Sequence, residues 1–230
     1  MRYLLLTGLL TLLLACGDTA AETEKTPVRS TETPAPVVAP ALPAAGAADR
    51  TYVPGQRIGM ITATTTPDEL VEIYGRENVR ADSVALGKGF FVNSYTIFPE
   101  TTSEINLVYP NEQMRVNDSQ VTIDLGSTDW KSAQNSVGIG TTLEELQNAN
   151  GHNFTFMGFD WDYGGVVTDW QGGALTDHRL RLGYDFANRE KVDLHHLLVG
   201  NQKVVTNNPY LKDVDVKVIQ VIVRLPAAAQ

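Results

Sequence analysis

The chain has 230 residues, with 18 basic and 27 acidic residues and a formal net charge of −9 at pH 7. The sequence contains no run of basic residues that would neutralise phosphates, so this charge argues against nucleic acid and anionic lipid headgroups as partners. Because Cys16 is the single cysteine, an intrachain disulfide is excluded and a hydrophobic core must hold the folded part.

The first fifteen residues have the pattern of an export signal. Arg2 precedes an apolar run from Leu4 to Leu14, which is the order of charged and apolar regions in a secretory leader. As a helix this run would cover about 16 Å, and the hydrocarbon core of a bilayer is ~30 Å thick. We therefore expect residues 1–15 to be a signal peptide and not a transmembrane helix.

The end of the apolar run, Leu13-Leu14-Ala15-Cys16, resembles the lipobox of bacterial lipoproteins. The resemblance implies attachment of diacylglycerol to Cys16, cleavage before it and acylation of the new amino terminus, and two or more acyl chains form a stable membrane anchor. Gly17 follows the cysteine, which in this family favours the outer membrane. The alternative is an ordinary secreted protein, and the membrane face on which a lipoprotein would stand, periplasmic or external, stays open.

Residues 16–50 are expected to form the lipidated cysteine and a disordered tether. From Gly17 to Arg50 there is no aromatic residue, and proline, alanine and threonine are frequent. Such a segment cannot bury enough apolar surface to offset its ordering entropy. We interpret it as a spacer between the membrane and a globular domain over residues 51–230.

Two similar helix patterns lie in the globular part. Thr66–Gly75 reads TPDELVEIYG, and Thr142–Gly151 reads TLEELQNANG. In each stretch the threonine can cap the helix, the glutamate three residues later can complete a capping box, and the glycine can end the helix in a left-handed conformation.

Alternating apolar residues predict strands after both helices. EINLVY ends at Tyr109 and RLRLGY ends at Tyr184, so the strands lie 75 residues apart while the helices lie 76 apart. This spacing favours an internal duplication, with units at about 51–130 and 131–230. Chance similarity of two common patterns is the alternative.

Further strands are predicted at Phe90–Phe98, at Val121–Leu125 and in the last apolar segment. In VDVKVIQVIVRL the alternation changes phase at Ile219, which indicates a bulge or a strand buried on both faces. The predicted fold class is α+β, with two duplicated helix-plus-antiparallel-sheet units and a closing C-terminal strand. This order of elements resembles the SmpA/OmlA-type lipoproteins and the β-lactamase-inhibitor-like fold, and the resemblance implies binding to other proteins.

The stretch GFDWDYGG, Gly158–Gly165, is the richest in candidate site residues. On a strand its aromatic and acidic residues would lie on opposite faces, which predicts a core strand with carboxylates in water. Aromatic rings can also stack on sugars, and paired carboxylates can cleave them, so a glycan-binding surface and a catalytic pair remain open. The glycan interpretation requires an exposed ring among the candidates, which are Asp160, Trp161, Asp162, Tyr163 and Trp170.

No motif of a metal, cofactor or catalytic site is found. Asp193, His195 and His196 are close in sequence but lack a metal-ligand spacing, and no serine-hydrolase, dinucleotide or phosphate-binding motif occurs. We therefore expect no metal and no cofactor. The sequence predicts a membrane-anchored envelope lipoprotein with a non-enzymatic protein-binding or structural role; the alternative is a glycan- or peptidoglycan-binding, or glycan-cleaving, lipoprotein.

Overall fold

The computed structural model describes residues 48–87, 89–111, 117–184 and 194–226. The predicted signal peptide, Cys16 and almost all of the predicted tether lie outside these residues, as does Asp193. Pro43–Gln230 form one compact unit, and the fold below is that of its described part.

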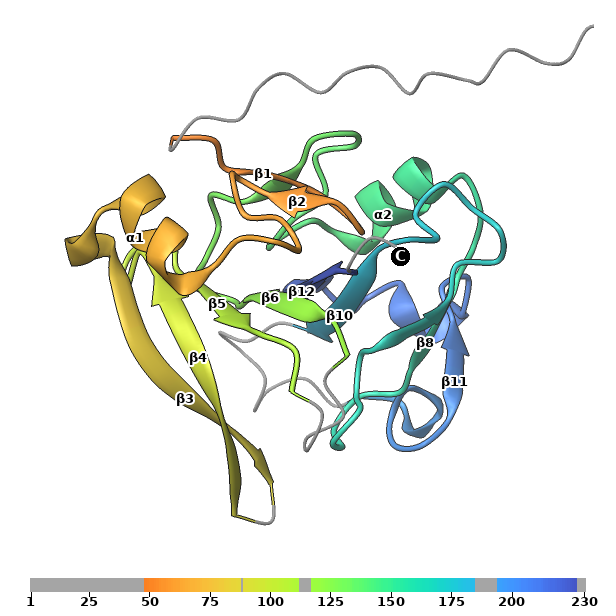
Figure 1. The fold of residues 1–230 in the computed structure, drawn as a ribbon. Coiled ribbons are helices and arrows are strands. Elements are labelled where there is room, and N and C mark those ends of the chain that lie inside the picture. Colours follow the sequence, from red (N-terminus) through yellow and green to blue (C-terminus); the bar gives the residue numbers. More distant parts are fainter. Residues whose placement is uncertain (1–47, 88, 112–116, 185–193, 227–230) are drawn as a thin grey trace, which may run out of the picture. The chain divides into compact units, whose positions relative to one another are not determined.

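The described part is predominantly β. Twelve strands in three sheets are present among the described residues, with two α-helices, α1 (Pro67–Tyr74) and α2 (Leu143–Asn150), and 3-10 turns η1 (Arg76–Asn78), η3 (His196–Leu198) and η4 (Pro209–Leu211) (Figure 1). The predicted α+β class with two duplicated helix-plus-sheet units is therefore wrong. Each helix has only eight residues and buries two side chains, so strands supply most of the core.

The largest sheet has six antiparallel strands in the order β10-β12-β6-β5-β4-β3. The C-terminal strand, β12, lies inside this sheet, between β10 and β6. The prediction of a bulge is confirmed, because the register of β10 against β12 shifts beside Ile219. The six strands are β3 (Val79–Gly87), β4 (Phe90–Ile97), β5 (Ile105–Val108), β6 (Ser119–Ile123), β10 (Arg179–Tyr184) and β12 (Val216–Leu225).

Two smaller sheets flank the large one. In the first, β1 (Thr51–Val53) lies between β2 (Arg57–Ile58) and β7 (Lys131–Ser132), with β1 and β7 parallel. In the second, β8 (Thr155–Met157) lies between β9 (Val167–Asp169) and β11 (Lys203–Val205). A single bridge between Val166 and Arg181 brings the second sheet beside β10.

Both helices have the predicted capping boxes. The Thr66 side chain accepts a hydrogen bond from the Glu69 amide at 3.3 Å, and the Glu69 carboxylate accepts one from the Thr66 amide at 2.7 Å. Thr142 and Glu145 repeat this pair at 3.2 and 2.8 Å. The left-handed exit is confirmed at Gly151 (φ +73°, ψ −4°), whereas the glycine after α1 has an extended ψ of 147° and differs from the prediction.

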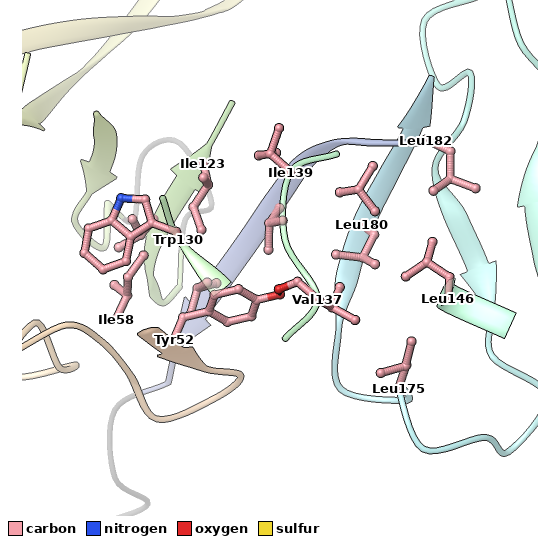
Figure 2. Packing of buried hydrophobic residues seen from close by; sticks show 14 of the residues in the cluster. Tyr52, Ile58, Ile123, Trp130, Val137, Ile139, Leu146, Leu175, Leu180 and Leu182 are labelled. Atoms are coloured by element: carbon pink, nitrogen blue, oxygen red, sulfur yellow. The ribbon is translucent and has the colours of Figure 1, made fainter. Parts of the chain in front are cut away.

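The hydrophobic core lies against one face of the six-stranded sheet. Leu180 and Leu182 of β10 and Ile123 of β6 point into it, and Figure 2 shows them with side chains from the flanking segments. The Tyr52 hydroxyl donates a hydrogen bond to the Val137 carbonyl at 3.0 Å, and the buried Trp130 ring donates one to the Ser103 carbonyl at 2.9 Å. The polar atoms of these two large residues are therefore satisfied inside the core.

Candidate functional site

The opposite face of β10, β12 and β6 forms a groove. Since side chains alternate along a strand, the core positions of Leu180 and Leu182 place Arg179 and Arg181 on this outer face. The register pairs Arg181 with Gln220, and it pairs Arg224 of β12 with Gln120 of β6. Three strands thus contribute polar side chains to one surface.

The groove has a volume of about 690 Å³. This volume lies within the roughly 300–1,000 Å³ range of small-molecule sites. Residues 54–56, in the turn between β1 and β2, form part of the lining, and residues 166–168 at β9 form another part. Its amide and hydroxyl side chains are Gln56, Gln120, Gln220, Thr168 and Thr176.

Three arginines line the groove in two different ways. The Arg181 guanidinium donates hydrogen bonds to the carbonyls of Gly164 at 2.7 Å and Asp162 at 3.2 Å, so its position is fixed. The guanidiniums of Arg179 and Arg224 form no hydrogen bond and no ion pair within the described part of the chain. Desolvation, and then the positive charge of Arg224, lower the pKa of Arg179, while Asp118 opposes this effect.

His178 lines the groove with a buried, neutral ring. Its side chain is 5% exposed, and its Nδ1 has no hydrogen-bond partner. Burial lowers the pKa of His178 to about 4, so the ring is uncharged at neutral pH. Three arginines and two aspartates, Asp118 and Asp177, therefore leave the groove with a small positive charge.

The sequence-derived candidates at 158–165 form a turn and not a core strand. The Gly164 amide donates a hydrogen bond to the Trp161 carbonyl at 2.9 Å, and Asp160 has a φ of +62°. The core-strand interpretation is therefore wrong. The reason for the turn is the close approach of two backbone segments at Gly165, where an added Cβ atom would lie 1.8 Å from the Leu182 carbonyl oxygen. The backbone therefore turns here and does not continue as a strand.

The three candidate rings have different exposure. Tyr163 is 62% exposed and meets the half-buried Trp161 ring edge to face at 5.2 Å. Trp170 is only 6% exposed and donates its indole N–H to the His178 carbonyl at 2.9 Å. The condition for a glycan surface, an exposed ring, is met by Tyr163. Trp170 is one of the residues that line the groove.

A second cavity of about 380 Å³ lies beside the same turn. Asp160 and Trp161 line it, together with Arg181, which also lines the first groove. The Tyr184 hydroxyl lies 2.9 Å from both carboxylate oxygens of Asp160 and donates to them. This contact gives Asp160 a structural role in holding the turn against β10.

The other histidines take no part in the groove. The His195 ring stacks on Tyr210 with 3.4 Å between centroids, and His196 lies beside it. Among the residues that the structure describes, no group of three or more His, Cys, Asp or Glu side chains could hold a metal ion. No helix in the same residues is long and apolar enough to cross a bilayer.

The arginine groove is not apparent from the linear sequence. The expectation that no basic cluster exists holds along the chain, but strand pairing brings Arg224 beside Arg179 and Arg181. One signal was present: two arginines alternate with two leucines in RLRLGY, which places both on one outer face. Comparison with protein-family models, curated protein sequences and solved structures finds no match for this chain.

Proposed function

We propose that this chain is a lipid-anchored envelope protein whose folded part is a non-enzymatic, glycan-binding module. The observation that supports this function best is the groove over β6, β12 and β10. It has the volume of a small-molecule site, and its lining includes three glutamine, three arginine and two threonine side chains. Such groups form directional hydrogen bonds with a ligand that carries many hydroxyls.

The turn beside the groove supports the same proposal. Arg181 holds the Asp162 and Gly164 carbonyls, so the exposed Tyr163 ring is attached to the groove wall. An aromatic face next to hydrogen-bonding side chains suits a sugar ring, which has an apolar face and a polar rim. We therefore propose Tyr163 as a stacking residue for a sugar at the end of the groove.

The test is binding of the detergent-solubilised full-length protein to an array of neutral and acidic envelope glycans and to peptidoglycan sacculi. We expect binding that Tyr163→Ala weakens. Tyr210→Ala is the matched control, because Tyr210 is also exposed, at 46%, but lies on η4 and not in the turn that Arg181 holds against the groove. Failure to bind any glycan would overturn the proposed function.

A second candidate function, binding of another envelope protein, rests on a different surface. The β3–β4 hairpin extends away from the other strands (Figure 1), and Phe91 on it is 62% exposed. An exposed aromatic residue on a projecting hairpin fits a protein contact. Crosslinking from a photoreactive residue at position 91 in native membranes tests this function, and absence of any crosslinked protein would contradict it.

A further inference from the structure

The positive charge of the groove is concentrated at Arg179 and Arg224. Arg179 pairs with Ile222 across β10 and β12, so Arg224 is its diagonal neighbour on the same face. Diagonal residues on paired strands lie roughly 7–8 Å apart, within reach of long side chains. Two guanidiniums that share no carboxylate can both donate hydrogen bonds to one incoming anion.

The surrounding charges limit the kind of anion. Asp118 and Asp177 also line the groove, and His178 adds no charge because its ring is neutral. The sum of three arginines and two aspartates is one positive charge. This balance suits a ligand with a single carboxylate in the groove, and it disfavours a polyanion, whose other charges would meet the two aspartates.

We propose that the groove binds an acidic sugar, with the ligand carboxylate held between Arg179 and Arg224. This inference rests on the proposed glycan-binding function and names the class of glycan. The carboxylate provides the charged contact, and the hydroxyls of the ligand bind the amide side chains, such as Gln120, that lie on the neighbouring strand. The ligand supplies a directly bound carboxylate, which these two guanidiniums lack within the described chain, because Asp118 acts on Arg179 through its charge without a hydrogen bond or an ion pair.

The experiment is calorimetric titration of the detergent-solubilised full-length protein with two acidic probes that each carry one carboxylate, methyl α-galacturonoside and the N-acetylglucosamine–N-acetylmuramic acid disaccharide. Each probe is compared with its methyl ester, which has the same rings and no charge. Since hydrogen bonds between charged groups are about twice as strong as neutral ones, we expect at least one acid to bind ~10-fold or more tighter than its ester. The double variant Arg179→Gln/Arg224→Gln should lose this preference and still bind the ester.

Arg76→Gln is the matched control, because Arg76 is exposed on η1 and does not line the groove. This variant should keep the preference for the acid. Asp118→Asn removes a negative charge from the groove and should tighten binding of the acid.

The outcomes separate the two proposals. Binding of esters or neutral array glycans without preference for the acid would overturn the acidic-sugar inference and leave the proposed function standing. A preference that survives in the double variant would also overturn the inference, because the carboxylate would then bind elsewhere. If inorganic phosphate competes for the groove as effectively as the acidic sugar does, the groove is an anion site without selectivity for sugars. That result would contradict the acidic-sugar inference. Absence of binding to every glycan would overturn both.

Discussion

At the residue scale, Gly165 explains why the aromatic stretch turns. Its amide donates a hydrogen bond to the Met157 carbonyl at 2.8 Å, and its carbonyl accepts one from the Leu182 amide at 2.8 Å. Its φ of +77° is one that L side chains rarely adopt. The turn that presents Tyr163 therefore depends on the absence of a side chain at this position.

We predict that Gly165→Ala destabilises the protein by roughly 3 kcal/mol, because a clash with the Leu182 backbone adds to the cost of a positive φ. Gly172→Ala is the control: Gly172 has a similar φ of +73°, but no atom lies within 4 Å of its added Cβ. It should cost about 1–2 kcal/mol, from the backbone conformation alone. Urea denaturation measures both losses, and equal losses would contradict the clash.

Because its ring is buried and neutral, His178 should make the stability of the protein depend on pH. The pKa of its ring is about 4 in the folded protein, against an ordinary value of 6.5. Between these values the unfolded chain binds more protons, so the stability from the neutral ring is complete above pH 6.5 and is lost as the pH falls toward 4. The loss attributable to this group is on the order of 3 kcal/mol.

The measurement is the free energy of unfolding at pH 7 and at pH 4.5, for wild type and for His178→Asn. The variant should show a smaller decrease between the two pH values, whatever its absolute stability. His152→Asn, at an exposed histidine, should retain the wild-type decrease. If the free energy of unfolding of His178→Asn decreases as much as that of the wild type between pH 7 and pH 4.5, the pH dependence does not come from His178.

At the element scale, β12 holds the large sheet together. It pairs with β10 on one side and with β6 on the other, so it joins strands distant in sequence. Its core residues alternate up to Val218, and after the bulge the alternation continues from Val221. A central strand of this kind must be buried on the core side along its whole length.

Val218→Ala should therefore cost about 2 kcal/mol, from lost burial of two methyl groups and the remaining cavity. Val205→Ala is the matched substitution on β11, where the side chain is 41% exposed, compared with 0% for Val218. We expect it to change stability by less than about 0.5 kcal/mol. Thermal denaturation distinguishes the two, and a similar effect at both positions would argue against a central role for β12.

At the scale of the whole molecule, the sequence predicts one attachment to the membrane, through Cys16. The net charge of −9 opposes binding to anionic lipid surfaces. We therefore predict that Cys16→Ser releases the protein into the soluble fraction of an envelope preparation, whereas Thr19→Ser leaves it in the membrane fraction. Immunoblotting of fractionated cells is the measurement, and membrane retention of Cys16→Ser would contradict a lipid anchor.

The sequence by itself determined the local structure of the described part. The capping boxes at Thr66 and Thr142, the strands β5 and β10 and the bulge at Ile219 were all predictable. Each depends on hydrogen bonds or side-chain alternation over a few neighbouring residues, so the signal lies within a short window.

Only the tertiary structure decided the fold class, the turn at Gly165 and the groove. The turn depends on a contact between Gly165 and Leu182, and the groove depends on the pairing of β12 with β10, which brings Arg224 beside Arg179. The capped helices gave strong local signals but contribute little to the core. Contacts between residues far apart in sequence follow from the pairing and packing of whole strands, and no local pattern specifies which strands become neighbours.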